Sequence, residues 1–460
     1  MNQRFQQNNP PEAFYLRHKT VTTRKTKARI SRTGAAVLAF LLVAPNPVLA
    51  QESRDHDNPA MATVPVAAGP ELGLNEAIAL SQGDQPSLAA YERDARASEE
   101  AAVAAGTKPD PVLQTSIQSY PVTGRTAFSP NRDDFTMYTI GFMREEVRRS
   151  KREAAAAALR ADAVVSRTQG TVQERRIRRN VMVAWINAVE ASSKQRLLAR
   201  IISDLQVAHR VMEAGIPTGA ATPSDALQMQ AEISLAEAQR VEARGQELRA
   251  RAELARWIGD AARRPLPTRI PSIDLPAGAD AGFDPSSNPE VRVADAEEAA
   301  AKLRTDVARR DRRPNISWGA SYSFRPDYGN FIGLQLSIPL QLNRSKLQDR
   351  RIAEASERES AAGLRAQDMR RDLNGQYYAA IADYQAADAQ LTILTSKSVP
   401  SLEASFDAAE ARYGAGQGTL ELPLSLVRRY VETTIQTLEE QAKRARAATD
   451  ITYLTQDVAK

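Results

Sequence analysis

The sequence predicts a mainly helical chain that also contributes four membrane-type β-strands and is built by duplicating one structural unit. Pro86 and Pro111 recur 203 positions later as Pro289 and Pro314, each time around a helix, an alternating strand pair and a very long helix. Hydrophobic content is 42% with only 5% aromatic residues, which is typical of long packed helices. The strand pairs alternate apolar with small polar residues, as the wall of a water-filled membrane barrel does.

Residues 1–50 have the pattern of a secretory signal peptide. Eight Lys or Arg and one Glu give them a charge of +7, so the rest of the chain carries −2 of the formal net charge of +5. A basic stretch precedes the apolar run at 35–44, and small residues follow at 48–50. The run is shorter than the roughly 20 residues of a transmembrane helix, although an N-terminal membrane anchor is the alternative. The positive net charge is therefore no argument for nucleic-acid binding.

The composition argues against an enzyme. Without cysteine there are no disulfides, no thiolate metal ligands and no lipid-bearing Cys after the signal. The sequence has no Gly-rich phosphate loop and no recognisable Ser/His/Asp arrangement, and its only histidines are His18, His56 and His209. We expect no catalytic residues, no cofactor and no dedicated metal site. No later segment is long enough for a transmembrane helix, so any membrane crossing must use strands.

The first repeat is expected at 74–258, after a linker at 51–73. A helix from Pro86 ends before Pro109–Pro111, and a hairpin follows at about 112–147. The helical pattern then runs from Arg148 to Ala214 without proline, which is roughly 100 Å of helix. A glycine-bearing tip at about 214–225 reverses the chain, with Thr222 or Ser224 as the cap of the returning helix.

The second repeat is expected at 288–460, after a linker at 259–287. Its hairpin lies at about 315–341 and its tip at about 413–423. A long helical pattern again joins them, and Pro400 is expected to kink or break it. Both long helices have heptad-like apolar spacing, which predicts coiled packing against neighbouring helices, although a soluble bundle would show the same spacing. These positions are Ile201, Leu205, Ala208 and Met212 in the first helix and Leu402, Phe406, Ala409 and Tyr413 in the second.

Two further features match between the repeats with an offset of 192. Trp185 corresponds to Tyr377, and the pair Arg178-Arg179 corresponds to Arg370-Arg371. Because Glu174 and Asp372 lie nearby in sequence, we interpret the arginines as ion-paired, solvated helix faces and not as a nucleic-acid contact.

Four strands cannot close a barrel, and an open sheet edge in lipid leaves backbone groups unpaired. Several copies of the chain must therefore contribute strands. An aqueous lumen needs more than about eight strands, so three copies with twelve strands are the smallest adequate number. The polar face is expected to line the lumen, through Gln114, Ser116, Gln118, Ser317, Ser321, Gln335 and Ser337.

The chain resembles the TolC-type outer-membrane efflux channels over residues 74–458. The resemblance lies in Leu74-Asn75-Glu76-Ala77, in the Pro109-Asp110-Pro111 turn before a strand, and in the two glycine-bearing tips. Within that family the heavy-metal (CzcC-like) branch is most similar, on the first hairpin: Pro109–Leu113, Tyr120–Gly124 and Phe135–Gly141.

The resemblance implies a homotrimer with a shared twelve-stranded barrel in the outer membrane and helices that cross the periplasm. It implies a periplasmic adaptor at the tips, an inner-membrane pump behind the adaptor, and heavy-metal cations as cargo. The expected adaptor-docking residues are Ala214, Gly215, Gly219, Asp225, Tyr413, Gly416 and Gly418. Some members narrow the tunnel mouth with two aspartates, where this chain has Leu422 and Ser425, so the mouth candidates are Glu421, Leu422 and Ser425, with Asp225 as a further polar group.

Two other readings compete with a passive export duct. A drug, small-molecule or type I secretion duct would share every feature except the cargo. A secreted coiled-coil structural protein would share the helices but has no use for alternating hairpins. Extraction without detergent distinguishes the two hypotheses, because a structural protein would be soluble and a duct would stay in the outer-membrane fraction.

Overall fold

The computed structural model describes residues 69–455, except 84, 220, 274, 276–281, 326–327 and 416. These residues belong to one compact unit. The expected signal peptide, His56 and most of the expected linker at 51–73 lie outside the described residues.

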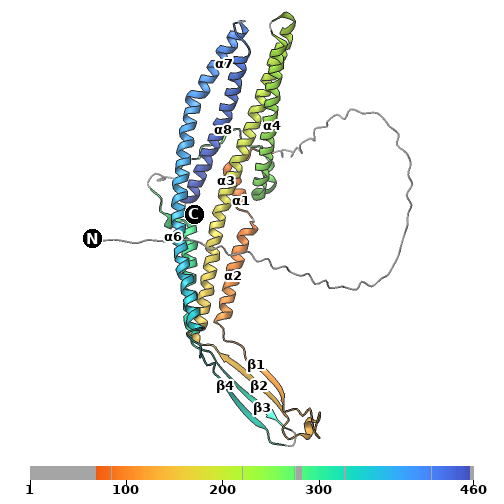
Figure 1. The fold of residues 1–460 in the computed structure, drawn as a ribbon, viewed down its shortest axis with the longest axis vertical. Helices are drawn as coiled ribbons and strands as arrows, with labels where there is room; N and C mark the ends of the chain where they lie inside the picture. The colour runs from red at the N-terminus through yellow and green to blue at the C-terminus, as the bar shows by residue number, and fades with distance from the viewer. Residues whose placement is uncertain are drawn as a thin grey trace, which may run out of the picture. The chain divides into compact units, whose positions relative to one another are not determined.

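The elements follow the duplicated order, and the predicted fold class, with long helices and four antiparallel strands, is confirmed (Figure 1). The first repeat comprises α1 (Leu74–Ser81), α2 (Pro86–Gly106), β1 (Val112–Gln118), β2 (Met137–Glu146), α3 (Arg149–Gly215) and α4 (Pro223–Ile258). The second comprises α5 (Pro289–Asp311), β3 (Ile316–Phe324), β4 (Phe331–Ser337), α6 (Gln348–Ile393), α7 (Val399–Gly414) and α8 (Glu421–Thr455).

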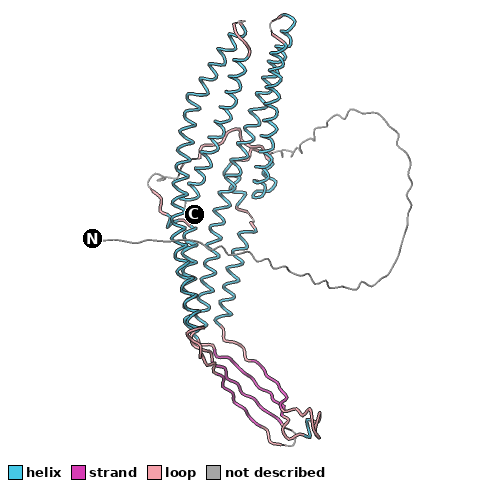
Figure 2. Tube along the Cα trace, viewed as in Figure 1, coloured by secondary structure: helices cyan, strands magenta, loops and turns pink. Residues whose placement is uncertain are grey.

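Figure 2 shows the four strands together at one end of the described unit and the helical turns α3–α4 and α7–α8 at the other. Helix α3 has 67 residues, which is about 100 Å at 1.5 Å per residue. Three helices begin with proline, at Pro86, Pro223 and Pro289. A backbone N–H at the first position of a helix has no acceptor within the helix, so proline, which lacks this N–H, is tolerated there. Among the described residues, no helix is both long and apolar enough to cross a membrane.

Pro400 does not break the second long helix. Residues Leu394–Ser398 form a π-helical turn, and α7 follows directly with Pro400 in its first turn. A π turn accommodates an extra residue within a helix, and here it lies where proline removes a backbone donor. The helical path therefore continues from Gln348 to Gly414.

The core lies along the long helices, in clusters centred on the matched aromatic residues. Trp185 packs with Leu254 of α4, Ala77 of α1 and Ala442 of α8. Tyr377 packs with Val291 of α5 and Ile451 of α8, and it stacks on Phe283 with ring centroids 4.7 Å apart. Both matched rings are almost fully buried, so the duplication places one large aromatic anchor in each half.

The described ends of the expected linkers are structured. Leu72 is fully buried, and its N–H donates to the carbonyl of Pro265 at 2.8 Å. Leu266 joins the same cluster, and Arg264 pairs with Glu76 at 2.6 Å. Composition alone suggested loops here, but the leucines have apolar surface to bury and therefore attach both segments to α1 and α3.

The arginine clusters form ion pairs, but their partners differ from those expected. Arg179 pairs with Asp450 of α8 at 2.6 Å, Arg176 with Glu290 of α5 at 2.9 Å, and Arg370 with Asp295 of α5. The ion-pair partners of these arginines are thus carboxylates on other helices, and not the sequence neighbours Glu174 and Asp372.

The sheet has the order β1-β2-β3-β4, and every neighbouring pair is antiparallel. Within the described chain β1 and β4 are the edges. Because the strand number is even, these two edges run in opposite directions.

Candidate functional site

The seven residues predicted to line a lumen share one face of the sheet. Residues directly opposite each other across antiparallel strands lie on the same face. The pairing aligns Gln114 with Gly141, Ser321 and Gly333, and it aligns Ser116 with Thr139 and Ser323. Ser317 pairs with Ser337, Gly319 pairs with Gln335, and Gln118 lies two positions beyond Ser116. The polar side chains that alternate along each of the four strands thus form one polar surface.

The opposite face is apolar and exposed. On β4, Ile332 is 80% exposed, Leu334 85% and Leu336 65%. Leu113, Ile117, Ile140, Phe142, Trp318, Tyr322 and Phe324 are also exposed, and the pairing places all of them on this face. A contiguous exposed apolar face of this kind marks a surface that meets a partner or a membrane, so this face suits an apolar environment.

Glycines bring the strands close together on the polar face. A Cβ at Gly141 would lie 2.7 Å from the Cβ of Ser321, and one at Gly319 would lie 2.8 Å from the carbonyl oxygen of Phe142. A Cβ at Gly333 would lie 2.7 Å from the Oγ of Ser321. Strands that crowd on one face and not on the other bend toward the crowded face, so the polar side is the inside of a curved sheet.

The first helical tip turns on one glycine and one cap. Gly219 has φ +75°, which side-chain-bearing residues rarely adopt, and it ends the 3-10 turn Ile216–Thr218. Thr222 caps α4: its Oγ1 accepts from the Asp225 N–H at 3.2 Å, and the Asp225 carboxylate accepts from the Thr222 N–H at 3.0 Å. Asp225 therefore serves as a helix cap at this position. Ala214 and Gly219 are exposed, and Gly215 is half-buried.

The second tip is anchored by an apolar residue. Leu420 is buried beside Met229 and Leu205, just before α8 begins at Glu421. Of the predicted mouth residues, Glu421 and Leu422 are exposed, and the Ser425 hydroxyl donates to the Leu422 carbonyl within the first turn of α8. Gly418 is exposed, and Gly416 lies outside the described residues.

The predicted docking residues Tyr413 and Asp225 approach each other across the two tips. Burial, together with the nearby Asp225 carboxylate, raises the pKa of the Tyr413 phenol. Tyr413 packs against the cluster of Leu205, Met229 and Leu424. The heptad positions of the two long helices therefore meet beneath the tips.

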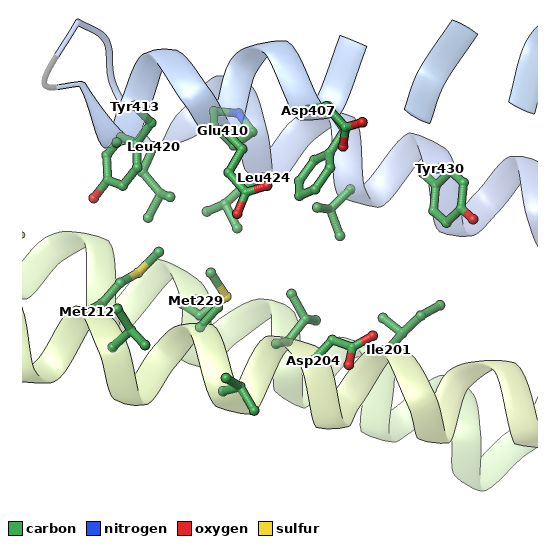
Figure 3. Close-up of a pocket in the computed structure, with 18 of the residues that line it drawn as sticks. Ile201, Asp204, Met212, Met229, Asp407, Glu410, Tyr413, Leu420, Leu424 and Tyr430 are labelled. Carbon is green, nitrogen blue, oxygen red and sulfur yellow. The ribbon is translucent and has the colours of Figure 1, made fainter. Parts of the chain in front are cut away.

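A groove that sequence reasoning did not identify lies between the two helical turns (Figure 3). Its volume is about 880 Å³. Figure 3 shows Met212 and Met229 facing Tyr413, Leu420 and Leu424 across it. Four carboxylates also line it: Asp204, Glu403, Asp407 and Glu410. Val211, another lining residue, is 68% exposed. The heptad seam was the signal that could have located this groove, but only the structure shows that the seam is left partly open.

Polar contacts join the helices around this groove. Arg428 of α8 pairs with Glu232 of α4, and the Tyr430 hydroxyl donates to Glu403 of α7 at 3.0 Å. The Glu232 carboxylate raises the pKa of Arg428 through its hydrogen bond and its charge. No group of three or more His, Asp or Glu side chains suited to a metal ion occurs among the described residues.

No protein-family model matches the sequence, and no curated protein matches it. Among solved structures, the chain is similar to CusC, whose crystal structures concern folding and transmembrane channel formation: the TM-score is 0.71 with 16% identity over 85% of this chain and 95% of that one.

Two other solved structures are similar over most of their length. The outer membrane protein VceC of Vibrio cholerae has a TM-score of 0.68 and 17% identity, covering 83% of this chain and 95% of that one. The Campylobacter jejuni CmeC outer membrane channel has a TM-score of 0.69 and 13% identity, covering 83% and 85%. The chain therefore has the TolC-type fold of these outer-membrane channels.

Proposed function

We propose that this chain is one subunit of a homotrimeric outer-membrane duct through which a partner pump exports its substrate. The observation that carries the proposal is the two-faced sheet. Every predicted lumen residue lies on the curved polar face, and the opposite face exposes aliphatic and aromatic side chains that suit lipid. The similar fold of solved outer-membrane channels supports the same assignment.

Closure requires other copies of the chain. The edges β1 and β4 run in opposite directions, so β4 of one copy can pair antiparallel with β1 of the next and continue the sheet. Three copies give twelve strands and leave no backbone edge exposed to lipid.

The duct is passive. Its barrel lining would consist of hydroxyl, amide and glycine groups, led by Ser116, Ser321 and Gln335, which hydrate a pore without binding cargo tightly. No covalent step is needed, and the expected lack of a cofactor and of catalytic residues agrees with this role. Selection of the cargo then belongs to the pump.

The helical tips and the groove beneath them would dock a periplasmic adaptor, which couples the duct to an inner-membrane pump. The groove combines an apolar floor, including Val211 and Met212, with acidic residues such as Asp407 and Glu410. A helix with an apolar stripe flanked by basic residues complements this surface. The docking residues at the tips themselves are Ala214, Gly215, Gly219, Asp225, Tyr413, Gly416 and Gly418, and Glu421, Leu422 and Ser425 would border the mouth.

We further propose heavy-metal cations as the cargo, on the likeness of the first hairpin to the CzcC-like branch. Deleting the gene tests this directly. The proposal predicts greater sensitivity to divalent metals, copper or silver, with unchanged tolerance of hydrophobic drugs. The opposite pattern would assign the duct to drug export.

Fractionation tests the duct itself. We expect the chain in the outer-membrane fraction, extracted only with detergent and recovered as a trimer. A chain that is soluble without detergent and absent from that fraction would instead support a secreted coiled-coil structural protein.

A further inference from the structure

The apolar alternation of β4 continues beyond the end of the strand. After Leu336 it reaches Ile338, Leu340 and Leu342, which are 50%, 79% and 87% exposed, although β4 ends at Ser337. From Ile332 to Leu342 the chain takes ten steps, at most ~33 Å in extended form. At a strand tilt of about 40° this spans roughly 25 Å, the height of an apolar barrel band. The segment therefore lies where the lipid-facing band ends on the side of the helices.

A basic cluster follows this apolar end directly. We call it the basic collar, and it consists of Arg344, Lys346, Arg350 and Arg351, all exposed. None of the four forms an ion pair with another described residue. The one carboxylate among them, Asp349, is already paired with Arg312 at 3.2 Å.

The strand edge of a second copy would bring little of the missing negative charge. The edge that would close against β4 is β1, and the residues before it carry Lys108 and Asp110. Lys108 pairs with Glu146 at 3.4 Å, which leaves one carboxylate, Asp110, for four cations. Phosphate groups, in contrast, are abundant at the boundary of a phospholipid leaflet, and each Lys or Arg near such a surface is attracted to anionic lipid.

We propose that residues 338–351 form a lipid-headgroup site, in which Leu340 and Leu342 enter the edge of the acyl layer and the basic collar binds the phosphates of anionic phospholipids. The site lies on the leaflet nearest the helices. It rests on the proposed function, because it requires the apolar face of the sheet to meet lipid. It would anchor the barrel edge in a chain that has no cysteine to carry a lipid.

Quenching of tryptophan fluorescence by brominated lipids tests this site. Trp318 is exposed on the apolar face and pairs with Leu336, on the same apolar alternation that leads to Leu340 and Leu342. The assembled protein is reconstituted in phosphatidylcholine vesicles that contain either brominated phosphatidylglycerol or brominated phosphatidylcholine. A Trp318→Phe variant supplies the background from Trp185 and Trp257.

The test variant carries Gln at all four collar positions. A matched control carries Gln at four arginines of α3 and α4, away from the sheet, and has the same charge change: Arg210, Arg240, Arg244 and Arg249. We expect the wild type and the control to prefer phosphatidylglycerol by about fivefold or more, and the collar variant to show a preference near one.

Three results would overturn the site. They are equal quenching of the wild type by both lipids, a collar variant that keeps the preference, and a collar variant that loses its trimer. The last result would mean that the cations meet a second copy. If neither lipid quenches Trp318, the apolar face of the sheet does not meet lipid. That result refutes the proposed function and not only the headgroup site.

Discussion

Gly141 of β2 lies directly opposite Ser321 of β3, and a Cβ atom on Gly141 would approach the Cβ of Ser321 to 2.7 Å. This pair lies on the polar face, where Gly319 and Gly333 also leave no room for a Cβ. The curvature of the sheet, and with it the proposed closure of a barrel, therefore requires a residue without a side chain at position 141.

Gly141→Val should prevent assembly, because its side chain forces β2 and β3 apart on the inner face. We expect the amount of detergent-extracted trimer to fall at least tenfold. Gly329→Ala is the control, since a Cβ there has no atom within 4 Å and its backbone needs no positive φ. Normal assembly of the Gly141 variant would show that the sheet is not tightly curved.

Trp185→Phe should lower stability modestly. The indole Nε1 donates to the carbonyl of Leu72 at 2.9 Å, and both residues are buried. Losing this hydrogen bond leaves a buried acceptor unpaired, which costs about 1–3 kcal/mol, whereas Trp185→Ala also opens a cavity and costs about 3–5 kcal/mol. Thermal unfolding measures both variants, with the half-buried Trp257→Phe as control. A Trp185→Phe variant as stable as the wild type would contradict the role of the hydrogen bond, and equal losses for Phe and Ala would contradict the cavity contribution.

The free energy of unfolding should fall between pH 10 and pH 12 through Tyr453. Burial and a 2.6 Å hydrogen bond to Glu290 raise the pKa of its phenol from 10.0 to about 12. Below pH 10 the phenol is protonated in both states and the stabilisation is complete; above it, the unfolded chain ionises first and the stabilisation is lost by pH 12. Allowing for solvent screening, we expect about 1–2 kcal/mol.

The variant Tyr453→Phe isolates this contribution. Its stability should decline less steeply over that interval than that of the wild type, because Phe has no proton to release. Chemical unfolding at pH 9, 10, 11 and 12 gives the comparison. Parallel pH profiles for the two proteins would refute the role of Tyr453.

Val211→Asp should uncouple the duct from its adaptor without affecting assembly. Val211 is 68% exposed in a groove that already contains Asp204 and Asp407, so another carboxylate removes apolar contact area and adds negative charge. We expect adaptor affinity to fall by about tenfold or more. Val241→Asp on α4 is a matched control, being 52% exposed and not part of the groove. Similar binding by both variants would exclude the groove as the docking site.

Much of the fold was predictable because its signals are periodic. Alternation located all four strands, and the absence of proline between Arg148 and Ala214 indicated α3, which spans Arg149–Gly215. The polar-face residues could be named because a strand presents alternate side chains to alternate faces. Thr222 and Ser224 were the two predicted caps of the returning helix, and the hydrogen bonds show that Thr222 is the cap.

The remaining features depend on contacts between distant segments. Leu72 was assigned to a linker because residues 51–73 are rich in Asp, Pro, Ala and Gly, yet the Trp185 indole and the Pro265 carbonyl hold it in the core. Pro400 was expected to kink or break a helix, and the structure shows a π turn before it and no break. The groove beneath the tips required the relative placement of α3, α4, α7 and α8, and no local pattern determines that.

The measurement that tests the account most directly is cross-linking between neighbouring copies of the sheet. The native chain has no cysteine, so introduced pairs report without background. We would combine Ser116→Cys on β1 with a cysteine at Gly333, Gln335 or Ser337 on β4, all on the polar face, and oxidise the membrane fraction. Because a disulfide requires Cβ atoms about 3.8 Å apart, one pairing register should give covalent dimers and trimers on a denaturing gel, and Ser116→Cys alone should not. If all three cysteine pairs gave only monomers, the result would contradict a barrel that closes between copies.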